Sequence, residues 1–157
     1  MTKKISRNRT RKILFQMLYA NSFATVDKSI FLDSFFEWRF EWDLDEKYLD
    51  EMLSIIKEHE SVFLGIINKF APKFKIEEMR IEYILPVYIS AAEMLYLNEE
   101  IPAKVSINEA IELCKKYSDD SARKIVNWIL NNLLKNFDNI KSDLDWIKYW
   151  NYSIFIK

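Results

Sequence analysis

Glycine is nearly absent from this chain, and this scarcity restricts its possible folds more than any other feature. Gly65 is the only glycine among 157 residues, and the chain has three prolines. Because these residue types form most tight turns, their shortage favours long helices with few sharp connections. Half of the residues are hydrophobic, and a chain of this size buries roughly 70% of its unfolded surface. We therefore expect an all-α fold with a substantial core.

The same composition excludes most kinds of catalytic and cofactor sites. Phosphate-binding loops of the GxGxxG or GxxxxGK type need several glycines. His59 is the only histidine and Cys114 the only cysteine, so the chain cannot form a zinc site of cysteines and histidines. Any serine or cysteine nucleophile that needs a histidine base would have to use His59. His59 also lies on an apolar stripe, where a packing role is expected. We predict that the protein is not an enzyme and uses no cofactor or metal.

Membrane and export signals are also missing from the sequence. No apolar run approaches the ~20 residues that a membrane-spanning helix needs, and no hydrophobic segment follows the charged N-terminus. One cysteine cannot form an internal disulfide, as is typical of a reducing compartment. We therefore expect a cytoplasmic location and no membrane partner.

Hydrophobic residues recur at spacings of three and four along most of the chain, which is the period of amphipathic helices. This period predicts about seven helices, the clearest over residues 8–23, 29–39, 45–70, 76–97, 106 onward and 122–133. No alternating pattern typical of a strand is present. The segment 45–70 reads as one kinked helix or as two.

Three local signals predict where these helices begin and end. Ala71 precedes Pro72 and should end the segment 45–70, because the residue before proline avoids helical geometry. Pro86 should break the segment 76–97 near Leu85. Ser106 and Glu109 have the spacing of a capping box, which predicts that a helix begins at Ser106.

Positive charge is concentrated at the N-terminus. The first twelve residues, here called the basic arm, carry a charge of +6 from Lys3, Lys4, Arg7, Arg9, Arg11 and Lys12. The remaining residues include 17 basic and 24 acidic side chains, for a charge of −7. A basic segment on an acidic body is typical of a polyanion-binding protein. The alternative is a disordered, solubilising tail, which accounts better for Lys3 and Lys4 than for the residues that lead into a helix.

The first predicted helix carries two distinct stripes. Ile13, Leu14, Met17 and Leu18 form its apolar face. A second stripe roughly 150° away, toward solvent, consists of Arg9, Lys12, Gln16 and Tyr19. Cations for phosphates, an amide for a base edge and a ring for stacking are what single-stranded RNA recognition requires.

Two motifs at opposite ends of the chain resemble the NusB family of bacterial transcription antitermination factors. One runs from Pro102 to Leu113 as PAKVSINEAIEL and continues at residues 124–127 as KIVN. The other is the arginine-rich stretch from Arg7 that leads to residues 16–19, QMLY. The resemblance extends over about residues 5–136. It departs from the family pattern at Trp128, which replaces a glycine, and over residues 83–88.

The resemblance implies a function as well as a helical-bundle fold. It implies a non-catalytic factor that binds boxA-type single-stranded RNA together with NusE, a small-subunit ribosomal protein, and other elongation factors during ribosomal RNA transcription. The expected RNA-binding residues, with Lys12 added from the stripe, are Arg7, Arg9, Arg11, Lys12, Gln16, Tyr19, Lys124 and Asn127. A monomer or weak homodimer is expected.

The last residues of the chain lie beyond the resemblance. We divide the chain into a NusB-like domain at 1–138 and an aromatic-rich C-terminal extension at 139–157. The extension is expected to pack on the same domain as an extra helix, through Ile140, Leu144 and Ile147; the alternative is a contact surface for another protein. A second hypothesis for the whole chain is a helical interaction module or homodimer whose basic arm binds an acidic partner.

Overall fold

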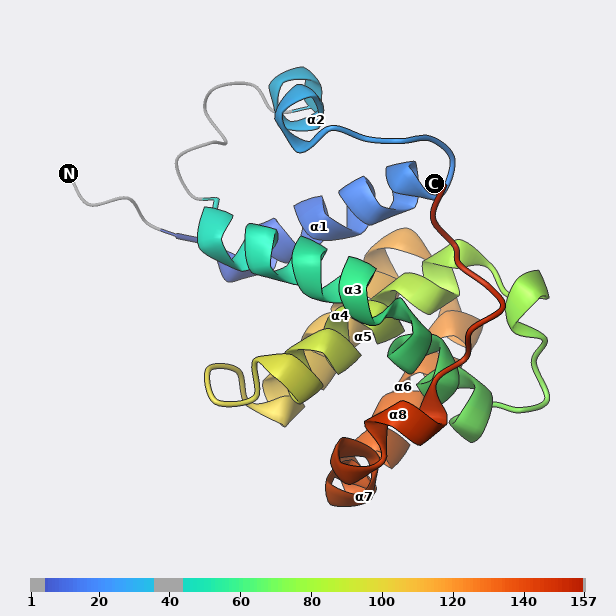
Figure 1. The fold of residues 1–157 in the computed structure, drawn as a ribbon. Helices are drawn as coiled ribbons and strands as arrows, with labels where there is room; N and C mark the ends of the chain where they lie inside the picture. The colour runs from blue at the N-terminus through green and yellow to red at the C-terminus, as the bar shows by residue number, and fades with distance from the viewer. Residues whose placement is uncertain (1–4, 36–43, 157) are drawn as a thin grey trace.

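The computed structural model describes residues 5–35 and 44–156, and within these ranges it is built of helices without strands (Figure 1). The predicted all-α class is therefore confirmed. The α-helices are α1 (Arg7–Asn21), α2 (Lys28–Phe35), α3 (Glu46–Phe70), α4 (Ile81–Tyr96), α5 (Ala103–Tyr117), α6 (Asp120–Lys135), α7 (Phe137–Ser142) and α8 (Leu144–Ile147). A 3-10 turn, η2 (Ile76–Glu78), precedes α4. The part of the predicted helix 29–39 that follows Phe35 lies outside the described residues.

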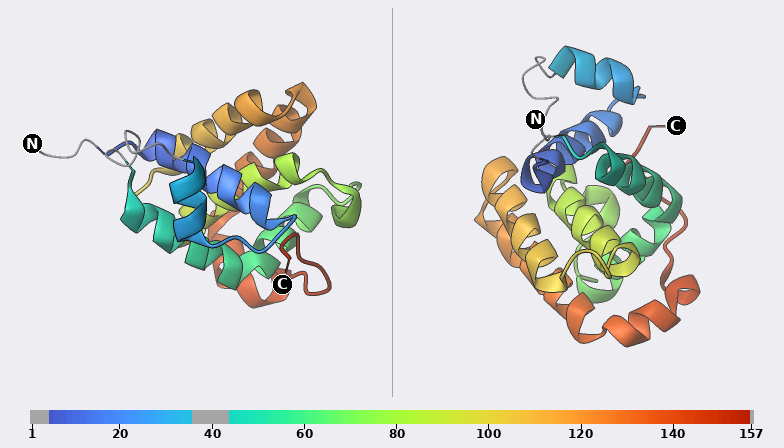
Figure 2. Two further views of the ribbon diagram at one scale, coloured as in Figure 1. Left: turned by 90° about the horizontal axis from the view of Figure 1, so that it is seen from above. Right: turned by 90° about the vertical axis from the view of Figure 1, so that its left-hand side faces the viewer.

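Helix α4 lies at the centre of the fold. Every residue from Ile84 to Leu95 is buried, as expected of a helix that is apolar on most of its circumference. Helices α1, α3, α5 and α6 all contact it, and the right panel of Figure 2 shows them around it. The core is thus built on α4.

The predicted break in α4 is wrong. The helix begins at Ile81 and continues through Pro86. Proline lacks one backbone donor, so at this position the helix loses the single bond to the carbonyl of Glu82, in its first turn. Burial of the surrounding helix outweighs this loss, because residues on both sides of Pro86 lie in the core.

The predicted capping box is also wrong. Helix α5 begins three residues earlier, at Ala103, with Pro102 as its N-cap. Ser106 is buried, and its Oγ lies 2.8 Å from the Oγ of Ser90 in the contact between α4 and α5. The serine therefore pairs with another helix instead of with its own helix end.

Helix α3 begins and ends where the sequence predicts. The carboxylate of Asp45 caps it by accepting a hydrogen bond from the amide of Tyr48 at 3.1 Å, and its last residue precedes Ala71 and Pro72. The backbone leaves helical geometry once, at His59, so the segment is one helix with a kink. The imidazole stacks on the ring of Tyr96 with centroids 4.3 Å apart, which agrees with the packing role expected for His59.

The C-terminal extension packs on the domain as the greater part of α7, which contacts α6, then α8, which contacts α3, and then an irregular segment, where the sequence predicts one extra helix. The backbone leaves helical geometry at Asn136 and Asp143, which is why α7 and α8 are separate. A Cβ at Gly65 would lie 1.7 Å from the carbonyl oxygen of Ile147. The chain's only glycine is therefore needed at the point where the end of α8 meets α3.

Candidate nucleic-acid interface

Helix α1 presents the predicted apolar face to the core. Ile13, Leu14, Met17 and Leu18 are all buried, where α1 packs on α3 and α4. The side chain of Ser6 accepts a hydrogen bond from the amide of Arg9 and so caps the helix at its N-terminus. The side chains of the basic arm are therefore held on a fixed helix from Arg7 onward.

Arg11 points into the core and not toward solvent. Its Nε donates to Glu93 Oε2 at 2.7 Å and its Nη2 donates to Oε1 at 3.1 Å, and the residue is 5% exposed. The hydroxyl of Tyr48 donates to the same carboxylate, and burial, followed by the charge of Glu93, raises the pKa of Tyr48 well above its usual value. Arg11 thus joins α1 to α4, and its guanidinium is not positioned to meet a phosphate.

Arg7 is also engaged within the protein. Its Nη2 lies 2.9 Å from Asp45 Oδ2, and its guanidinium lies over the ring of Tyr48, 4.8 Å from the centroid. Its side chain remains 36% exposed. Arg7 therefore links α1 to the start of α3 and still has one edge open to solvent.

The predicted outer stripe of α1 lies on its exposed side. Arg9 is exposed, Lys12 is half-buried and Tyr19 is 37% exposed. Gln16 is half-buried and turns toward α5, where its Nε2 donates to the hydroxyl of Tyr117 at 2.6 Å. Its buried Oε1 has no hydrogen-bond partner among the described residues.

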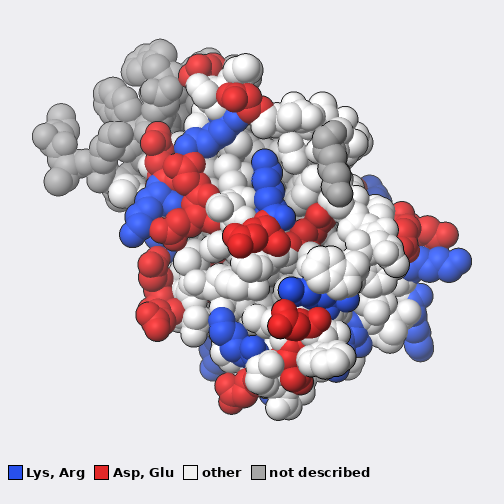
Figure 3. All heavy atoms as spheres, in the orientation of Figure 1, with Lys and Arg blue, Asp and Glu red and all other residues white. Residues whose placement is uncertain are grey.

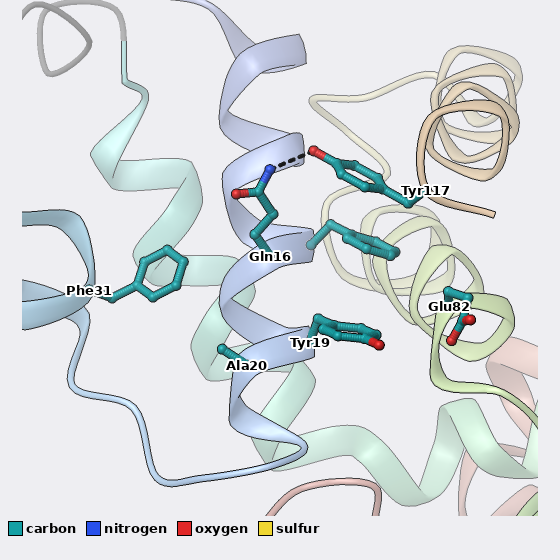
Figure 4. A pocket seen from close by; sticks show the side chains of 7 residues that line it. Gln16, Tyr19, Ala20, Phe31, Glu82 and Tyr117 are labelled. Carbon is teal, nitrogen blue, oxygen red and sulfur yellow. Dashed lines mark hydrogen bonds between the residues drawn. The ribbon is translucent and has the colours of Figure 1, made fainter. Parts of the chain in front are cut away.

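An aromatic pocket of about 460 Å³ opens along this stripe (Figure 4). The rings of Phe15 and Tyr117 stack with centroids 4.4 Å apart, and Tyr19 lies nearly parallel to Phe15 at 6.3 Å. Figure 4 shows Tyr19 and Tyr117 on one side of α1, with Glu82 beyond them, and Phe31 approaching from the other side. The complete lining is Phe15, Gln16, Tyr19, Ala20, Phe31, Glu82 and Tyr117.

Sequence reasoning missed Tyr117 as part of this site. The contact between Gln16 and Tyr117 joins residues 101 positions apart, and no periodicity relates such distant positions. The available signal was an aromatic residue directly before the polar turn at 118–121, on a helix expected to be amphipathic. That signal does not distinguish a pocket wall from an ordinary core residue.

Lys124 and Asn127 lie on a different helix from the stripe. Both are exposed on α6. The Oδ1 of Asn127 accepts a hydrogen bond from Asn131 Nδ2 at 2.8 Å, while Lys124 lines a second cavity together with Trp128. The predicted second group therefore belongs to a separate part of the surface.

The face formed by α2, α3 and the C-terminal extension does not carry a basic field. In Figure 3, acidic and basic side chains intermingle over it. A polyanion is attracted where positive charge is not cancelled by neighbouring acids. This face is therefore a poor candidate for a polyanion site.

The described residues provide no evident metal centre or membrane span. No group of three or more His, Cys, Asp or Glu side chains within 5–35 and 44–156 is arranged to hold a metal ion. Burial raises the pKa of the Cys114 thiol to about 12, so it is a poor nucleophile. No helix in the same ranges is both long and apolar enough to cross a bilayer.

Comparison with known proteins finds relatives over most of this chain, including nearly all of α1, the helix that carries the outer stripe. The model of the NusB family matches residues 8–135. The transcription antitermination protein NusB of Clostridium perfringens (strain SM101 / Type A) is 33% identical over 134 residues, covering 84% of this chain and 98% of the relative. That of Staphylococcus carnosus is 32% identical over 134 residues, covering 85% and 99%.

A solved structure of a NusB protein has a similar fold. NusB of T. maritima superposes with a TM-score of 0.65 at 26% identity, covering 84% of this chain and 92% of that one. The relatives are named as transcription antitermination proteins, which are not enzymes, and this confirms the prediction of a non-catalytic protein. The extent of the family match and the identity to these relatives together show that the chain belongs to the NusB family.

Proposed function

We propose that this protein is a cytoplasmic transcription antitermination factor that binds boxA-type single-stranded RNA through α1. The observation that carries the proposal is the coincidence of the exposed basic stripe with the aromatic pocket. Arg9 and Lys12 lie about one to three turns before Gln16 and Tyr19 on the same side of a capped helix. Charge and stacking surface thus follow one another along one line, as the sugar-phosphate chain and bases of a single strand require.

Each side chain of the stripe has a distinct role in this proposal. Arg9 and Lys12 bind phosphates, and Arg7 adds to the local potential through its exposed edge. A base stacks on Tyr19, and the half-buried amide of Gln16 is the polar group nearest to the edge of that base. Arg11 is left out of the RNA-binding set because it is paired with Glu93 in the core. Lys124 and Asn127 are kept as contacts of a longer strand.

The protein partner follows from family membership. We propose that the chain acts together with NusE and other elongation factors during transcription of ribosomal RNA, as the NusB resemblance implies. The names of the relatives support the antitermination part of this proposal. The match of the family model over residues 8–135 supports the family membership on which the proposal depends.

Titration of a fluorescent boxA-like RNA, with and without NusE, tests the proposal. We expect binding by the protein alone and tighter binding with NusE. Tyr19→Ala should weaken RNA binding by about 5- to 150-fold if one base stacks there. Trp146→Ala is the matched control, because this exposed aromatic residue lies on the C-terminal extension. Equal affinity of both variants for RNA would remove Tyr19 from the site.

The second hypothesis, an interaction module or homodimer, is supported by exposed aromatic residues away from α1. Trp146 and Trp150 are 90% and 71% exposed, and such residues are enriched in protein interfaces. Light scattering and pull-down with nuclease-treated protein measure association without RNA. Self-association that is abolished by Trp146→Ala, together with absence of RNA binding, would favour this second hypothesis.

A further inference from the structure

We infer that this chain has a second stacking site for single-stranded RNA, formed by Trp128 and Phe74 and flanked by Lys73 and Lys124. We call it the Trp128 wall. The inference rests on the proposed RNA-binding function and extends it to a part of the surface outside the aromatic pocket. The bound groups would be a base stacked on the indole ring and the phosphates beside it.

The Trp128 wall encloses a cavity of about 520 Å³ between α6 and the segment that follows α3. Trp128 is 59% exposed and Phe74 is 45% exposed, so both rings are open to solvent at this cavity. The complete lining is Phe70, Ala71, Pro72, Lys73, Phe74, Lys124, Ile125 and Trp128.

The indole ring is held in place although it is exposed. Its Nε1 donates to the carbonyl oxygen of Phe70 at 2.7 Å. The bond satisfies the ring's polar group and fixes its orientation, so the flat face is what remains available to a ligand. The segment opposite is also ordered by backbone bonding, since the amide of Phe74 donates to the carbonyl of Ala71 at 3.1 Å. Because the ring and the opposite segment are already held in place, little conformational entropy is lost when a ligand binds.

Charge indicates which ligand fits this surface. Neither Lys73 nor Lys124 forms an ion pair or hydrogen bond with another described residue. No acidic side chain is among the residues that line the cavity. Exposed rings beside unneutralised cations are typical of single-stranded nucleic-acid sites, where rings stack on bases and lysines bind phosphates. A purely apolar peptide would gain nothing from the lysines.

An exposed arginine, Arg80, lies beside the acidic side chains at the edge of the aromatic pocket and at the start of α6. Glu82 lines the pocket, and the neighbouring Tyr83 donates its hydroxyl to Asp119, the N-cap of α6. Arg80 lies 2.6 Å from Glu82 and 3.9 Å from Asp119. These acids are therefore partly neutralised by an exposed arginine, which also offers its own charge to a phosphate.

Trp128 is a departure of this chain from the family pattern, which has glycine at this position. A glycine could supply neither the ring nor the hydrogen bond to Phe70. The Trp128 wall is therefore a specific property of this chain, and the affinity it adds should be absent wherever the pattern is kept.

Binding of RNAs of two lengths to two tryptophan variants tests the inference. Fluorescence anisotropy is measured with a boxA-like RNA of about 8 nucleotides and with one of about 16 nucleotides extended at either end, within the range of strand lengths occupied by single-strand binding folds. The variants are Trp128→Leu and the control Trp146→Leu. We expect Trp128→Leu to weaken binding of the longer RNA by about 5- to 150-fold and to leave the shorter RNA unaffected.

Ultraviolet cross-linking of the unmodified protein provides a second measurement that does not depend on the folding of a variant. Mass spectrometry should find the longer RNA attached to peptides that contain Phe74 or Trp128. Lys73→Gln combined with Lys124→Gln should lower the salt dependence of binding for the longer RNA only, by a slope of about 1.4.

The outcomes separate this inference from the proposed function. If the shorter RNA binds and Trp128→Leu affects the longer one no more than Trp146→Leu does, the inference is overturned and the function stands. If neither RNA binds the unmodified protein, both fail. Binding of an acidic, aromatic peptide that depends on Trp128, with RNA binding independent of it, would assign the wall to a protein partner and also overturn the inference.

Discussion

Helix α1 and the C-terminal extension both pack on α3, but they do so through different interactions. Helix α1 buries its apolar face and a charged pair, Arg11 with Glu93, within the core. The extension buries Ile140 and Ile154 at the edge of the core and adds hydrogen bonds to α3. Tyr149 donates its amide to the carbonyl of Ser61 at 2.9 Å, and Ile154 donates its amide to Glu60 at 2.9 Å.

The two ends of the chain therefore contribute to stability by different means. Removing one partner of a buried charged pair leaves a charge that water cannot reach, whereas a surface hydrogen bond is readily replaced by one to water. Helix α1 is therefore part of the fold itself and lies within the family match at residues 8–135. The extension follows the match and adds the buried side chains of Ile140 and Ile154 to a core that the matched residues largely form.

The largest expected effect on stability comes from breaking the buried ion pair between Arg11 and Glu93. Arg11→Ala should lower the free energy of unfolding by about 3–5 kcal/mol, because it leaves Glu93 buried without its cation. Urea denaturation measures the change. The double variant Arg11→Met/Glu93→Leu should recover most of the loss, since it removes both charges. A loss below about 1 kcal/mol for the single variant would mean that α1 is no more integral to the core than the extension is.

A smaller effect is expected where the extension meets α3. Gly65→Ala places a Cβ against the carbonyl of Ile147, at 1.7 Å without rearrangement, which should displace the end of α8. Overpacking costs about 1–3 kcal/mol and alanine restores about 1 kcal/mol of helix propensity, so a net loss of up to about 2 kcal/mol is expected. Limited proteolysis should cut the extension faster while the rest of the chain stays protected. A variant that is more stable, with the extension still protected, would contradict the observed docking.

The smallest effect on stability is expected on the outer side of α1. Arg9→Gln and Lys12→Gln should each change the free energy of unfolding by less than about 0.5 kcal/mol. Each should lower the salt dependence of RNA binding by a slope of about 0.7, the value for one phosphate of a single strand. Anisotropy titrations at several salt concentrations provide this slope. An unchanged slope in both variants would show that the outer stripe does not bind phosphates.

Periodicity predicted much of the fold, because burial of an apolar stripe is a local property of a helix. It located α3 and α6 and identified the buried face of α1, including Leu14 and Leu18. It failed at Pro86 and Ser106, where local rules for helix ends gave way to contacts between helices. Pro86 is tolerated inside a buried helix, and Ser106 bonds to Ser90 across the core.

The candidate site was predictable only in part for the same reason. Tyr19 and Gln16 follow from the position of the outer stripe on one helix. Tyr117 and its hydrogen bond with Gln16 depend on the distance between α1 and α5, which no segment specifies alone.

The sequence by itself determined the helical class, the absence of glycine-dependent loops and the concentration of cations at one end of the chain. Tertiary structure decided which of those cations are available. Arg9 and Arg11 are two residues apart, and at 100° per residue they point to different sides of α1. One faces solvent, and the other meets Glu93 from a helix 82 positions away. A charge count treats them alike, because the carboxylate that neutralises Arg11 reaches it only when the chain folds.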